Sequence, residues 1–154
     1  MILIISTIGC DQISKELVRE KVKPNELIEV YRDNILLTKV ENTGAALGLG
    51  QNLPPIGKKI LLNFLPLVVL IALLFYSLRK SQVNGCIGIA CAFIIGGGIG
   101  NLIDRFLFGS VTDFFYIQYG FLKTGIFNMA DVSVTLGAIM LLLLSFLKPN
   151  KNPI

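Results

Sequence analysis

Long uncharged apolar runs alternate with shorter polar stretches along this chain. The clearest run covers residues 60–78 and is bounded on both sides by pairs of basic residues. As a helix it would be about 28 Å long, close to the roughly 30 Å hydrocarbon core of a bilayer. Two further apolar runs cover residues 85–105 and 126–147. The pattern therefore predicts three membrane-spanning helices in this part of the chain.

The N-terminal segment, residues 2–18, has a mixed character. It is apolar as far as Cys10, and the charged residues Asp11, Lys15 and Glu16 follow. Asp11 and Lys15 are four residues apart, so on a helix they share a face and can neutralise each other. We expect a fourth spanning helix here. The alternative is a secretory signal ending near Cys10, but no basic residue precedes the apolar run and three more spans follow.

Residues 24–50 differ from the apolar runs because they carry many charges. Within them, residues 26–40 are rich in β-forming side chains, and Asp33-Asn34 is a turn candidate. We expect a small antiparallel β element that sits on the membrane surface. The predicted fold is therefore an all-α polytopic membrane protein with four transmembrane helices and a small outer-face antiparallel β element.

Charge in the short connections predicts the orientation of this fold. The loop 79–84 and the tail 148–154 carry basic residues and no acidic ones. The positive-inside rule places such segments in the cytoplasm. Both termini are then cytoplasmic, and the β element lies on the outer face together with the connection 106–125.

Composition supports one membrane-embedded domain, 1–154, and limits its chemistry. The chain is 53% hydrophobic with a mean hydropathy of +0.71, and 16% of its residues are charged, against roughly 25% in soluble domains. The net charge of +4 is dispersed without a basic patch, so we expect no nucleic-acid binding. The sequence contains no histidine. That absence excludes Ser-His-Asp and Cys-His nucleophiles and the zinc sites built on histidine.

The three cysteines, Cys10, Cys86 and Cys91, lie in apolar stretches and show no Cys-x-x-Cys spacing. We interpret them as small buried hydrophobic residues, not as metal ligands or disulfide partners. No metal and no cofactor are therefore expected. Carboxylates, hydroxyls, amides, lysine and arginine remain as material for catalysis.

Two aspartates beside apolar segments need a reason, because carboxylates near hydrocarbon are costly. Asp113 lies in the connection and Asp131 in the first turns of the last span, so both are expected at the same membrane surface. Two adjacent carboxylates in a low dielectric share a proton. The charged one can then take a proton from water while the neutral one donates to the substrate. The alternative is that Asp113 serves a loop and Asp131 the start of a helix.

Further polar residues lie near this pair in the sequence. Three of them follow helical spacing and should share a face: Asn101, Asp104 and Arg105. Arg105 could pair with Asp104, or stabilise a carbonyl group of a substrate. Asn128 could hydrogen-bond the reacting group, or satisfy the helix start. The small, flexible segment 42–48 could be an ordinary loop, or a backbone that approaches a bound peptide closely.

Four motifs occur in order along the chain: Asp11-Gln-Ile-Ser-Lys15; Asn42-Thr-Gly-Ala-Ala46; Gly100-Asn-Leu-Ile-Asp-Arg105, continuing to Val111-Thr-Asp-Phe114; and Phe127-Asn-Met-Ala-Asp131. On these motifs the chain resembles the bacterial lipoprotein signal peptidase family (signal peptidase II, prolipoprotein signal peptidase). The motifs extend from residue 11 to residue 131, and their combination is highly specific although each alone is weak. The resemblance implies a four-helix intramembrane aspartic endopeptidase with an outer-face β-cradle. Such enzymes remove signal peptides from diacylglyceryl-modified prolipoproteins by cutting before the lipidated cysteine.

The resemblance also implies roles for individual residues. The catalytic pair would be Asp113 and Asp131; substrate-binding or supporting residues would be Asn42, Gly44, Asn101, Arg105 and Asn128; structural support would come from Asp11, Lys15 and Asp104. It further implies a monomer in the bacterial cytoplasmic (inner) membrane, in contact with lipid and inhibited by the cyclic peptide globomycin. Two positions depart from the family pattern. Leu47 stands where many relatives have an aromatic residue, and Thr112 replaces an aliphatic one.

Two other classes of function compete with a peptidase. In a small transporter or proton-coupled carrier, the polar residues Asp104, Arg105, Asp113 and Asp131 would line a route. That alternative is disfavoured because the sequence has no internal repeat and its polar residues cluster at one surface, away from the midplane where carriers bind their cargo. A non-catalytic assembly factor would explain the glycines at 96–100, but not the two aspartate motifs.

Overall fold

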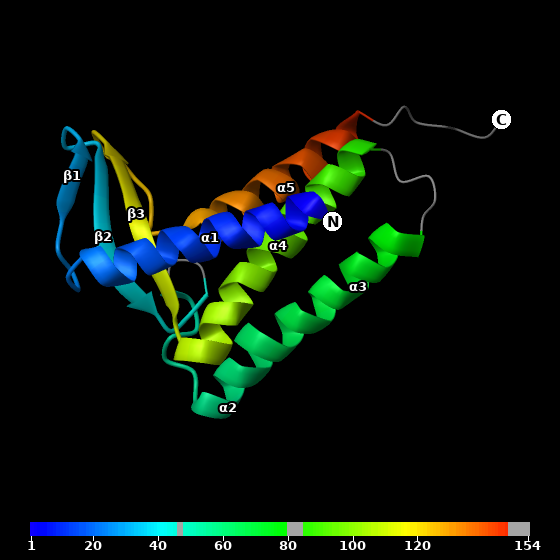
Figure 1. Ribbon diagram of the computed structural model, residues 1–154, viewed down its shortest axis with the longest axis horizontal. Coiled ribbons are helices and arrows are strands. Elements are labelled where there is room, and N and C mark those ends of the chain that lie inside the picture. The colour runs from blue at the N-terminus through cyan, green and yellow to red at the C-terminus, as the bar shows by residue number, and fades with distance from the viewer. Residues whose placement is uncertain (46–47, 80–84, 148–154) are drawn as a thin grey trace.

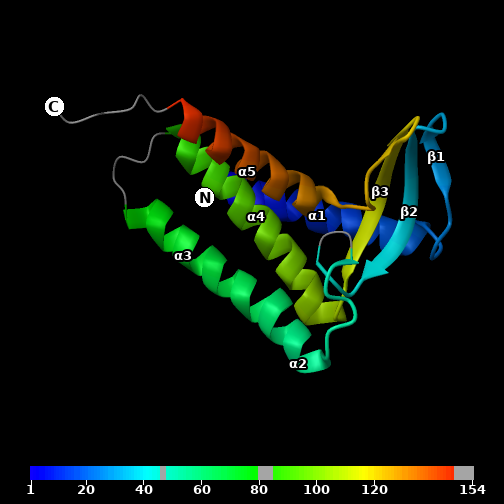
Figure 2. The same ribbon diagram turned by 180° about the vertical axis from the view of Figure 1, so that it is seen from behind.

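The computed structural model describes residues 1–45, 48–79 and 85–147. The helices are α1 (Ile2–Lys21), α2 (Pro55–Lys58), the π-helical η2 (Lys59–Phe64), α3 (Leu65–Arg79), α4 (Gly85–Phe108) and α5 (Met129–Phe146). The strands are β1 (Ile28–Tyr31), β2 (Ile35–Asn42), β3 (Val111–Tyr119) and β4 (Leu122–Lys123). The sheet lies at one end of the helices, and α1 begins and α5 ends on the side away from it (Figure 1). The view from behind shows the same arrangement (Figure 2).

Within the described ranges, three helices are long and apolar enough to cross a membrane: Pro55–Arg79, which joins α2, η2 and α3, and the helices α4 and α5. They confirm the three predicted apolar spans, with ends that differ by a few residues. Helix α1 is not among them, because its second half carries charged residues. Large apolar side chains are exposed on these helices, including Phe75 and Phe146, as expected for surfaces that face lipid.

Helix α1 keeps its polar residues on the side that faces the protein. Its buried residues recur every three or four positions, which places them on one face: Ile4, Thr7, Asp11, Lys15 and Val18. That face packs on α4 and α5. Apolar side chains are exposed on the opposite face, with Ile2, Ile5, Ile13 and Leu17, and charged side chains such as Glu16 are exposed only in the second half of the helix. The first half of α1 is therefore apolar on its outer side.

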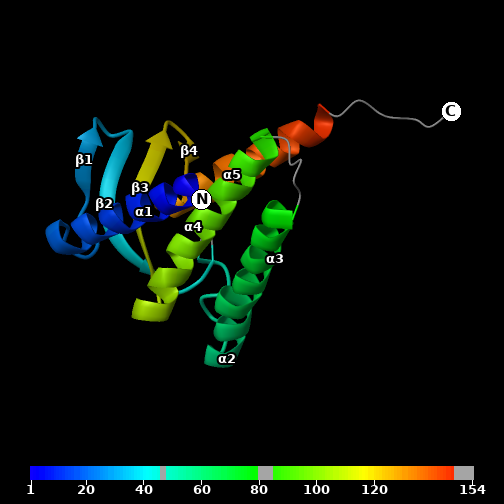
Figure 3. The same ribbon diagram turned by 45° about the vertical axis from the view of Figure 1, so that its right-hand side comes forward.

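The glycines of α4 allow the neighbouring helices to approach closely. A Cβ atom on Gly97 would collide with the carbonyl oxygen of Ala130 in α5. A Cβ atom on Gly96 would lie 2.8 Å from Cβ of Thr7, and one on Gly98 would lie 2.6 Å from the side chain of Leu70. Helix α4 therefore packs against α1, α3 and α5, and it lies between α1 and α3 in the ribbon (Figure 3).

The sheet is larger than the sequence predicted. It has four antiparallel strands in the order β1-β2-β3-β4. The predicted turn is confirmed, because the backbone N–H of Asn34 donates to the carbonyl of Tyr31 over 3.2 Å. However, the connection after α4 supplies two of the strands, so Asp113 lies on β3, opposite Val40 of β2, and not in a loop. The first four residues of β3 are all buried, so this strand lacks the alternation that marks a half-buried one.

The prediction that all three cysteines are buried was wrong for two of them. Cys91 is buried in α4, whereas Cys10 and Cys86 are exposed. Cys10 precedes Ile13 and Leu17 by three and seven residues, so it belongs to the apolar outer face of α1. An apolar side chain on a membrane helix is not driven inside, since lipid tails solvate it as well as the protein does.

Candidate active site

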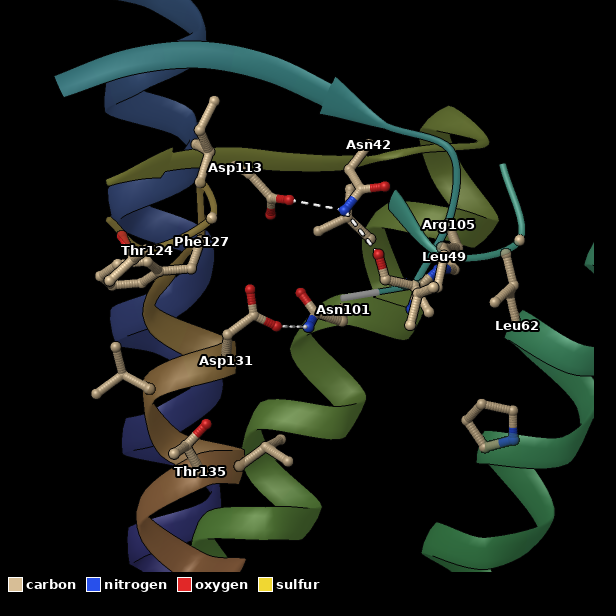
Figure 4. A pocket seen from close by; sticks show the side chains of 18 of the residues that line it. Asn42, Leu49, Leu62, Asn101, Arg105, Asp113, Thr124, Phe127, Asp131 and Thr135 are labelled. Carbon is tan, nitrogen blue, oxygen red and sulfur yellow. Dashed lines mark hydrogen bonds between the residues drawn. The ribbon is translucent and has the colours of Figure 1, made fainter. Parts of the chain in front are cut away.

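A cavity of about 910 Å³ opens between the sheet end of α4, the start of α5 and the Pro55–Arg79 helix. Its polar lining residues are Asn42, Asn101, Arg105, Asp113, Thr124, Asp131 and Thr135 (Figure 4). Most of the remaining lining is apolar and includes Leu61, Leu62, Val132 and Leu136. The cavity therefore combines a small polar cluster with a hydrocarbon-like wall, as small-molecule and peptide sites often do.

Asp113 reaches this cavity from β3, with only 3% of its surface exposed. Its Oδ2 accepts a hydrogen bond from Nδ2 of Asn42 over 2.9 Å, and its Oδ1 accepts one from Nδ2 of Asn128 over 2.6 Å. Burial raises the pKa of Asp113 to about 6; the nearby charge of Asp131 adds to the rise, and the two amide hydrogen bonds oppose it. This carboxyl group can therefore hold a proton close to neutral pH.

Asp131 reaches the cavity from the first turn of α5, where it forms a capping box with Asn128. The side-chain oxygen of Asn128 accepts from the backbone N–H of Asp131 over 3.0 Å, and Oδ2 of Asp131 accepts from the backbone N–H of Asn128 over 3.2 Å. Oδ1 of Asp131 accepts from Nδ2 of Asn101 over 2.8 Å. Asp131 thus serves the helix start and faces the cavity at the same time. Its carboxylate and that of Asp113 turn towards the same space (Figure 4).

Asn128 connects the two aspartates and is fully buried. Its amide nitrogen donates to Asp113 and also to Oδ1 of Asn101 over 3.2 Å. Its oxygen is occupied by the helix cap of Asp131. Both alternatives for this residue therefore apply, because it satisfies the helix start and also contacts the carboxylate pair.

The segment that begins at Asn42 is held at the rim of the cavity. Oδ1 of Asn42 accepts from the backbone N–H of Gly44 over 2.8 Å, and the carbonyl of Gly44 accepts from Nη2 of Arg105 over 3.1 Å. A Cβ atom on Gly44 would lie 2.7 Å from the carbonyl oxygen of Leu49, so a larger residue does not fit there. Leu47, where we noted a departure from the family pattern, lies outside the described residues.

Asp104 lies apart from the cavity, although we expected it to share a face with Asn101 and Arg105. Asn101 and Arg105 line the cavity and Asp104 does not. In the part of the chain that the structure describes, the ion pairs of Asp104 join it to Lys15 and Arg19, and the alternative pairing with Arg105 does not form. Helical spacing predicts a broad face only, and Asp104 lies at its edge, turned towards α1.

A buried ionic cluster stands behind the site, centred on Lys15, whose side chain is fully buried. The Nζ atom of Lys15 lies 2.8 Å from Oδ2 of Asp11 and 3.2 Å from Oδ2 of Asp104, and it donates to Oδ1 of Asn101 over 2.9 Å. Asp11 also accepts from the backbone N–H of Ala130 over 2.9 Å. The predicted Asp11–Lys15 pair is confirmed. Through this pair, α1 contacts Asn101 and Asp104 of α4 and the backbone of Ala130 in α5.

Sequence reasoning missed two members of this cluster and one link to the sheet. Gln12 donates to Asp104 over 3.1 Å, and Arg19 pairs with Asp104 at 2.9 Å. Arg19 also donates from Nε to the hydroxyl of Thr112, which in turn donates to Glu41 over 3.0 Å. The hydroxyl of Thr112 thus has a partner on either side. A signal was present for Arg19, since it lies one helical turn after the buried lysine of α1.

The fold and the site define a class: a polytopic helical membrane protein whose cavity holds two nearby carboxylates at the sheet end of the bundle. The family model for signal peptidase (SPase) II matches residues 3–147 of this chain. The chain therefore belongs to the signal peptidase II family, a family of membrane peptidases.

Individual relatives agree with this membership over nearly the whole length. The lipoprotein signal peptidase of Halothermothrix orenii is 40% identical over 142 residues, which is 92% of this chain and 91% of that protein. The one from Streptococcus thermophilus is 34% identical over 149 residues, 97% of this chain and 93% of that protein. A bacterial membrane enzyme solved by the in meso method superposes with a TM-score of 0.84 at 28% identity, covering 99% of this chain and 92% of the other. A second such structure gives a TM-score of 0.81.

Proposed function

We propose that this protein is an intramembrane aspartic endopeptidase that removes signal peptides from diacylglyceryl-modified prolipoproteins by cutting before the lipidated cysteine. The observation that carries the proposal is the shared cavity of Asp113 and Asp131. Both carboxylates accept hydrogen bonds from Asn128, Asp113 from its side-chain amide and Asp131 from its backbone N–H. Membership of the signal peptidase II family supports the peptidase activity and the prolipoprotein substrate.

The chemistry requires one carboxylate that is charged and one that is protonated. A water molecule between them would lose a proton to the charged carboxylate and attack the peptide carbonyl, while the other carboxyl donates its proton to the carbonyl oxygen. Arg105 lies in the same cavity, and its N–H groups could donate hydrogen bonds to a substrate carbonyl or to an oxygen that becomes negatively charged.

The supporting residues divide into two groups by position. Those within or next to the cavity would orient the substrate or the carboxylates: Asn42, Gly44, Asn101, Arg105 and Asn128. Those in the buried cluster would hold the helices in register: Asp11, Lys15 and Asp104. The second group touches the first at one point only among the contacts of the described residues, the hydrogen bond from Lys15 to Asn101.

The substrate would enter sideways from the bilayer. Its diacylglyceryl tail and its apolar signal helix already partition into lipid, and the cavity wall that faces the Pro55–Arg79 helix is apolar, with Leu61 and Leu62. Because lipid already solvates this hydrocarbon, moving it against that wall would cost little free energy. The polar cluster at the end of the cavity would then receive the peptide bond.

We further propose that α1 is a fourth transmembrane helix, with the sheet on the outer face of the cytoplasmic (inner) membrane and both termini in the cytoplasm. The support from the fold is the orientation of α1, whose buried face carries Asp11 and Lys15 and whose exposed residues as far as Ile13 are mostly apolar. The basic loop 79–84 and the tail 148–154, which predict this orientation, lie outside the described residues. A monomer would suffice, because one chain supplies both carboxylates.

The decisive experiment is cleavage of a purified, diacylglyceryl-modified prolipoprotein by the purified protein, followed by gel shift with and without globomycin. We expect cleavage by the wild type, inhibition by globomycin, and no cleavage by either Asp113→Asn or Asp131→Asn. Asp33→Asn is the matched control, because Asp33 is exposed in the β1–β2 turn. Near wild-type cleavage by either cavity variant, or ion flux in liposomes without any cleavage, would overturn the proposal.

A further inference from the structure

We propose that Lys15 is a positioning residue of the reaction: by holding the amide of Asn101 in one orientation, it makes Asp131 the charged carboxylate and leaves the shared proton on Asp113. This inference rests on the proposed aspartic mechanism and adds to it an assignment of the two carboxyl groups. Lys15 itself does not line the cavity, so it acts through its neighbour.

The orientation of Asn101 follows from the nature of its partners. The ammonium group of Lys15 can only donate, so the side-chain atom of Asn101 that lies 2.9 Å from it is the oxygen. The NH₂ group then points the other way and donates to Oδ1 of Asp131 over 2.8 Å. The oxygen of Asn101 also accepts from Nδ2 of Asn128 over 3.2 Å. Loss of Lys15 would therefore remove the shorter and charged one of the two hydrogen bonds that hold the amide, and would make it easier for the oxygen to turn towards Asp131. That carboxylate would then lose a donor, or would need a proton of its own.

The other two amides of the site are oriented differently. The oxygens of Asn128 and Asn42 both accept from backbone N–H groups, so their NH₂ groups are free to face Asp113. These orientations are built into the helix cap of α5 and the turn after β2. The oxygen of Asn101 instead accepts from two side chains, Lys15 and Asn128. Of these two, Asn128 also donates to both carboxylates of the cavity, whereas Lys15 lies outside the cavity and can be replaced without changing the cavity lining.

The two carboxylates stand in unlike surroundings. Asp131 lies in the first turn of α5, where the helix dipole favours a negative charge, and it accepts from a backbone N–H and from the amide that Lys15 polarises. Asp113 lies on a strand and accepts from two neutral amides. Burial raises the pKa of Asp113 to about 6, above that of an ordinary carboxyl group, which agrees with Asp113 as the member of the pair that takes up the shared proton.

The reaction then follows with a definite role for each group. Asp131 takes a proton from water as the water oxygen bonds to the peptide carbon, and Asp113 gives its proton to the carbonyl oxygen. In the resulting tetrahedral intermediate, Asp131 returns its proton to the peptide nitrogen as the carbon–nitrogen bond breaks. Asp113 regains a proton from one hydroxyl as the carboxyl product forms. Protons and atoms balance, and the pair returns to its starting state.

Several charged groups surround the Asn101–Asp131 contact from the packed elements: Asp11, Lys15 and Arg19 on α1, Asp104 and Arg105 on α4, Glu41 on β2 and Asp113 on β3. The cluster around Lys15 pairs two cations with two carboxylates. Its formal charges therefore cancel, which leaves the hydrogen bond to Asn101 as the direct route from Lys15 to Asp131.

A double-mutant cycle tests this route, with cleavage of the lipid-modified substrate as the readout. For Lys15→Met and for Asn101→Leu, we expect kcat to fall about 100-fold, as a misplaced reacting group does, and KM to change by less than about threefold. The acidic limb of the pH profile should move to higher pH in both variants. The double variant should be no slower than the slower single variant, because both changes remove one interaction.

Arg19→Gln is the matched control. It removes a cation from the same carboxylate, Asp104, but within the described residues the polar contacts of Arg19 do not include Asn101. We therefore expect an unchanged acidic limb even where the protein becomes less stable. A double variant whose loss is the product of the two single losses would overturn the inference. An equal shift of the limb in Arg19→Gln would do the same.

If Lys15→Met fails to fold, Asn101→Asp decides the question. The new carboxylate keeps an acceptor for Lys15 but has no NH₂ group for Asp131, so kcat should fall and the acidic limb should still shift. Near wild-type kinetics in a folded Asn101→Asp protein would refute the inference while the peptidase stands. A wild-type protein that does not cleave the substrate would remove the proposed function, and this inference with it.

Discussion

The backbone N–H of Thr112 donates a hydrogen bond to Oδ2 of Asp104 over 3.1 Å. This contact joins the last turns of α4 to the first residues of β3, directly before Asp113. Asp104 also receives Lys15 and Arg19 from α1, so one fully buried carboxylate connects two helices and a strand. The position of Asp113 in the cavity therefore depends on a residue that does not itself reach the cavity.

Replacing Asp104 should destabilise the protein strongly. Asp104→Asn leaves two cations without their shared partner in a buried place, and we expect the free energy of unfolding to fall by about 3–5 kcal/mol. Thermal unfolding of the detergent-solubilised protein measures this. Glu16→Gln is the control, because Glu16 also pairs with Arg19 but its side chain is 62% exposed; we expect a change of less than about 1 kcal/mol. Equal effects of the two substitutions would contradict a special role for Asp104.

The ionisation of Asp113 should lower the free energy of unfolding at neutral pH. Burial raises the pKa of Asp113 from 3.8 to about 6, so between these values the folded state holds a proton that the unfolded state has released. The free energy of unfolding should therefore fall as the pH rises from about 4 to about 6, and stay lower above that range. Asp113→Asn removes the ionisation and should be more stable than the wild type near neutral pH, by up to about 3 kcal/mol.

Unfolding of the wild type and of Asp113→Asn across this pH range checks the prediction. The difference between them should shrink as the pH falls through about 6, because the wild-type carboxyl group becomes neutral there as well. Asp33→Asn, in an exposed turn, should give no comparable gain. If Asp113→Asn is instead less stable than the wild type by the same amount at every pH, the lost hydrogen bonds outweigh the cost of the buried charge.

Close packing of α4 on α5 gives a third prediction. A Cβ atom on Gly97 would collide with the carbonyl of Ala130, the residue before Asp131. Gly97→Ala should therefore push the start of α5 away, lower stability by about 1–3 kcal/mol, and reduce prolipoprotein cleavage. In Gly85→Ala, on the same helix, the new Cβ atom meets nothing within 4 Å, and stability and cleavage should stay near the wild type. Intact cleavage by Gly97→Ala would mean that α5 tolerates the shift.

Thr112 offers a fourth test, since its hydroxyl connects Arg19 with Glu41. Thr112→Val keeps the shape of the side chain but removes both hydrogen bonds within a buried region. We expect a loss of about 1–3 kcal/mol in the free energy of unfolding, as for other unsatisfied buried polar groups. Thermal unfolding of Thr112→Val and of Thr112→Ser, which retains a hydroxyl, separates the hydrogen bonds from the lost methyl group. Equal stability of Thr112→Val and the wild type would contradict this account.

Much of the helical part could be predicted, because local signals determine it. Apolar runs of membrane length predicted the three spans, and spacing by four residues predicted the Asp11–Lys15 pair, which is confirmed. Strand β3 was missed, since its first residues are buried on both sides and its partner β2 lies about 70 residues earlier in the chain, with Glu41 opposite Thr112. Periodicity in a short window carries no information on such pairings.

In the candidate site, too, local patterns could be predicted from the sequence and contacts between distant parts of the chain could not. The cost of carboxylates near hydrocarbon brought Asp113 and Asp131 forward as a pair, and the cavity contains both. The resemblance grouped Asp104 with Asp11 and Lys15. Helical spacing alone gave no indication that Asp104 would turn from the cavity, because it defines a face about a third of the helix wide. Side-chain hydrogen bonds between elements that are 86 to 93 residues apart, such as those of Lys15 and Arg19, have no trace in the sequence alone.

The capping box at the start of α5 uses the same carboxylate that faces the cavity. If Asp131 is catalytic as proposed, mutations that confer resistance to an inhibitor bound there should not arise at this residue, because every exchange would weaken the start of α5 as well as the reaction. Escape mutations should instead arise in the leucine-rich wall, where the shape can change while the fold survives. Resistance should therefore arise more slowly against inhibitors that bind mainly to the carboxylates than against inhibitors that bind mainly to the apolar wall of the cavity.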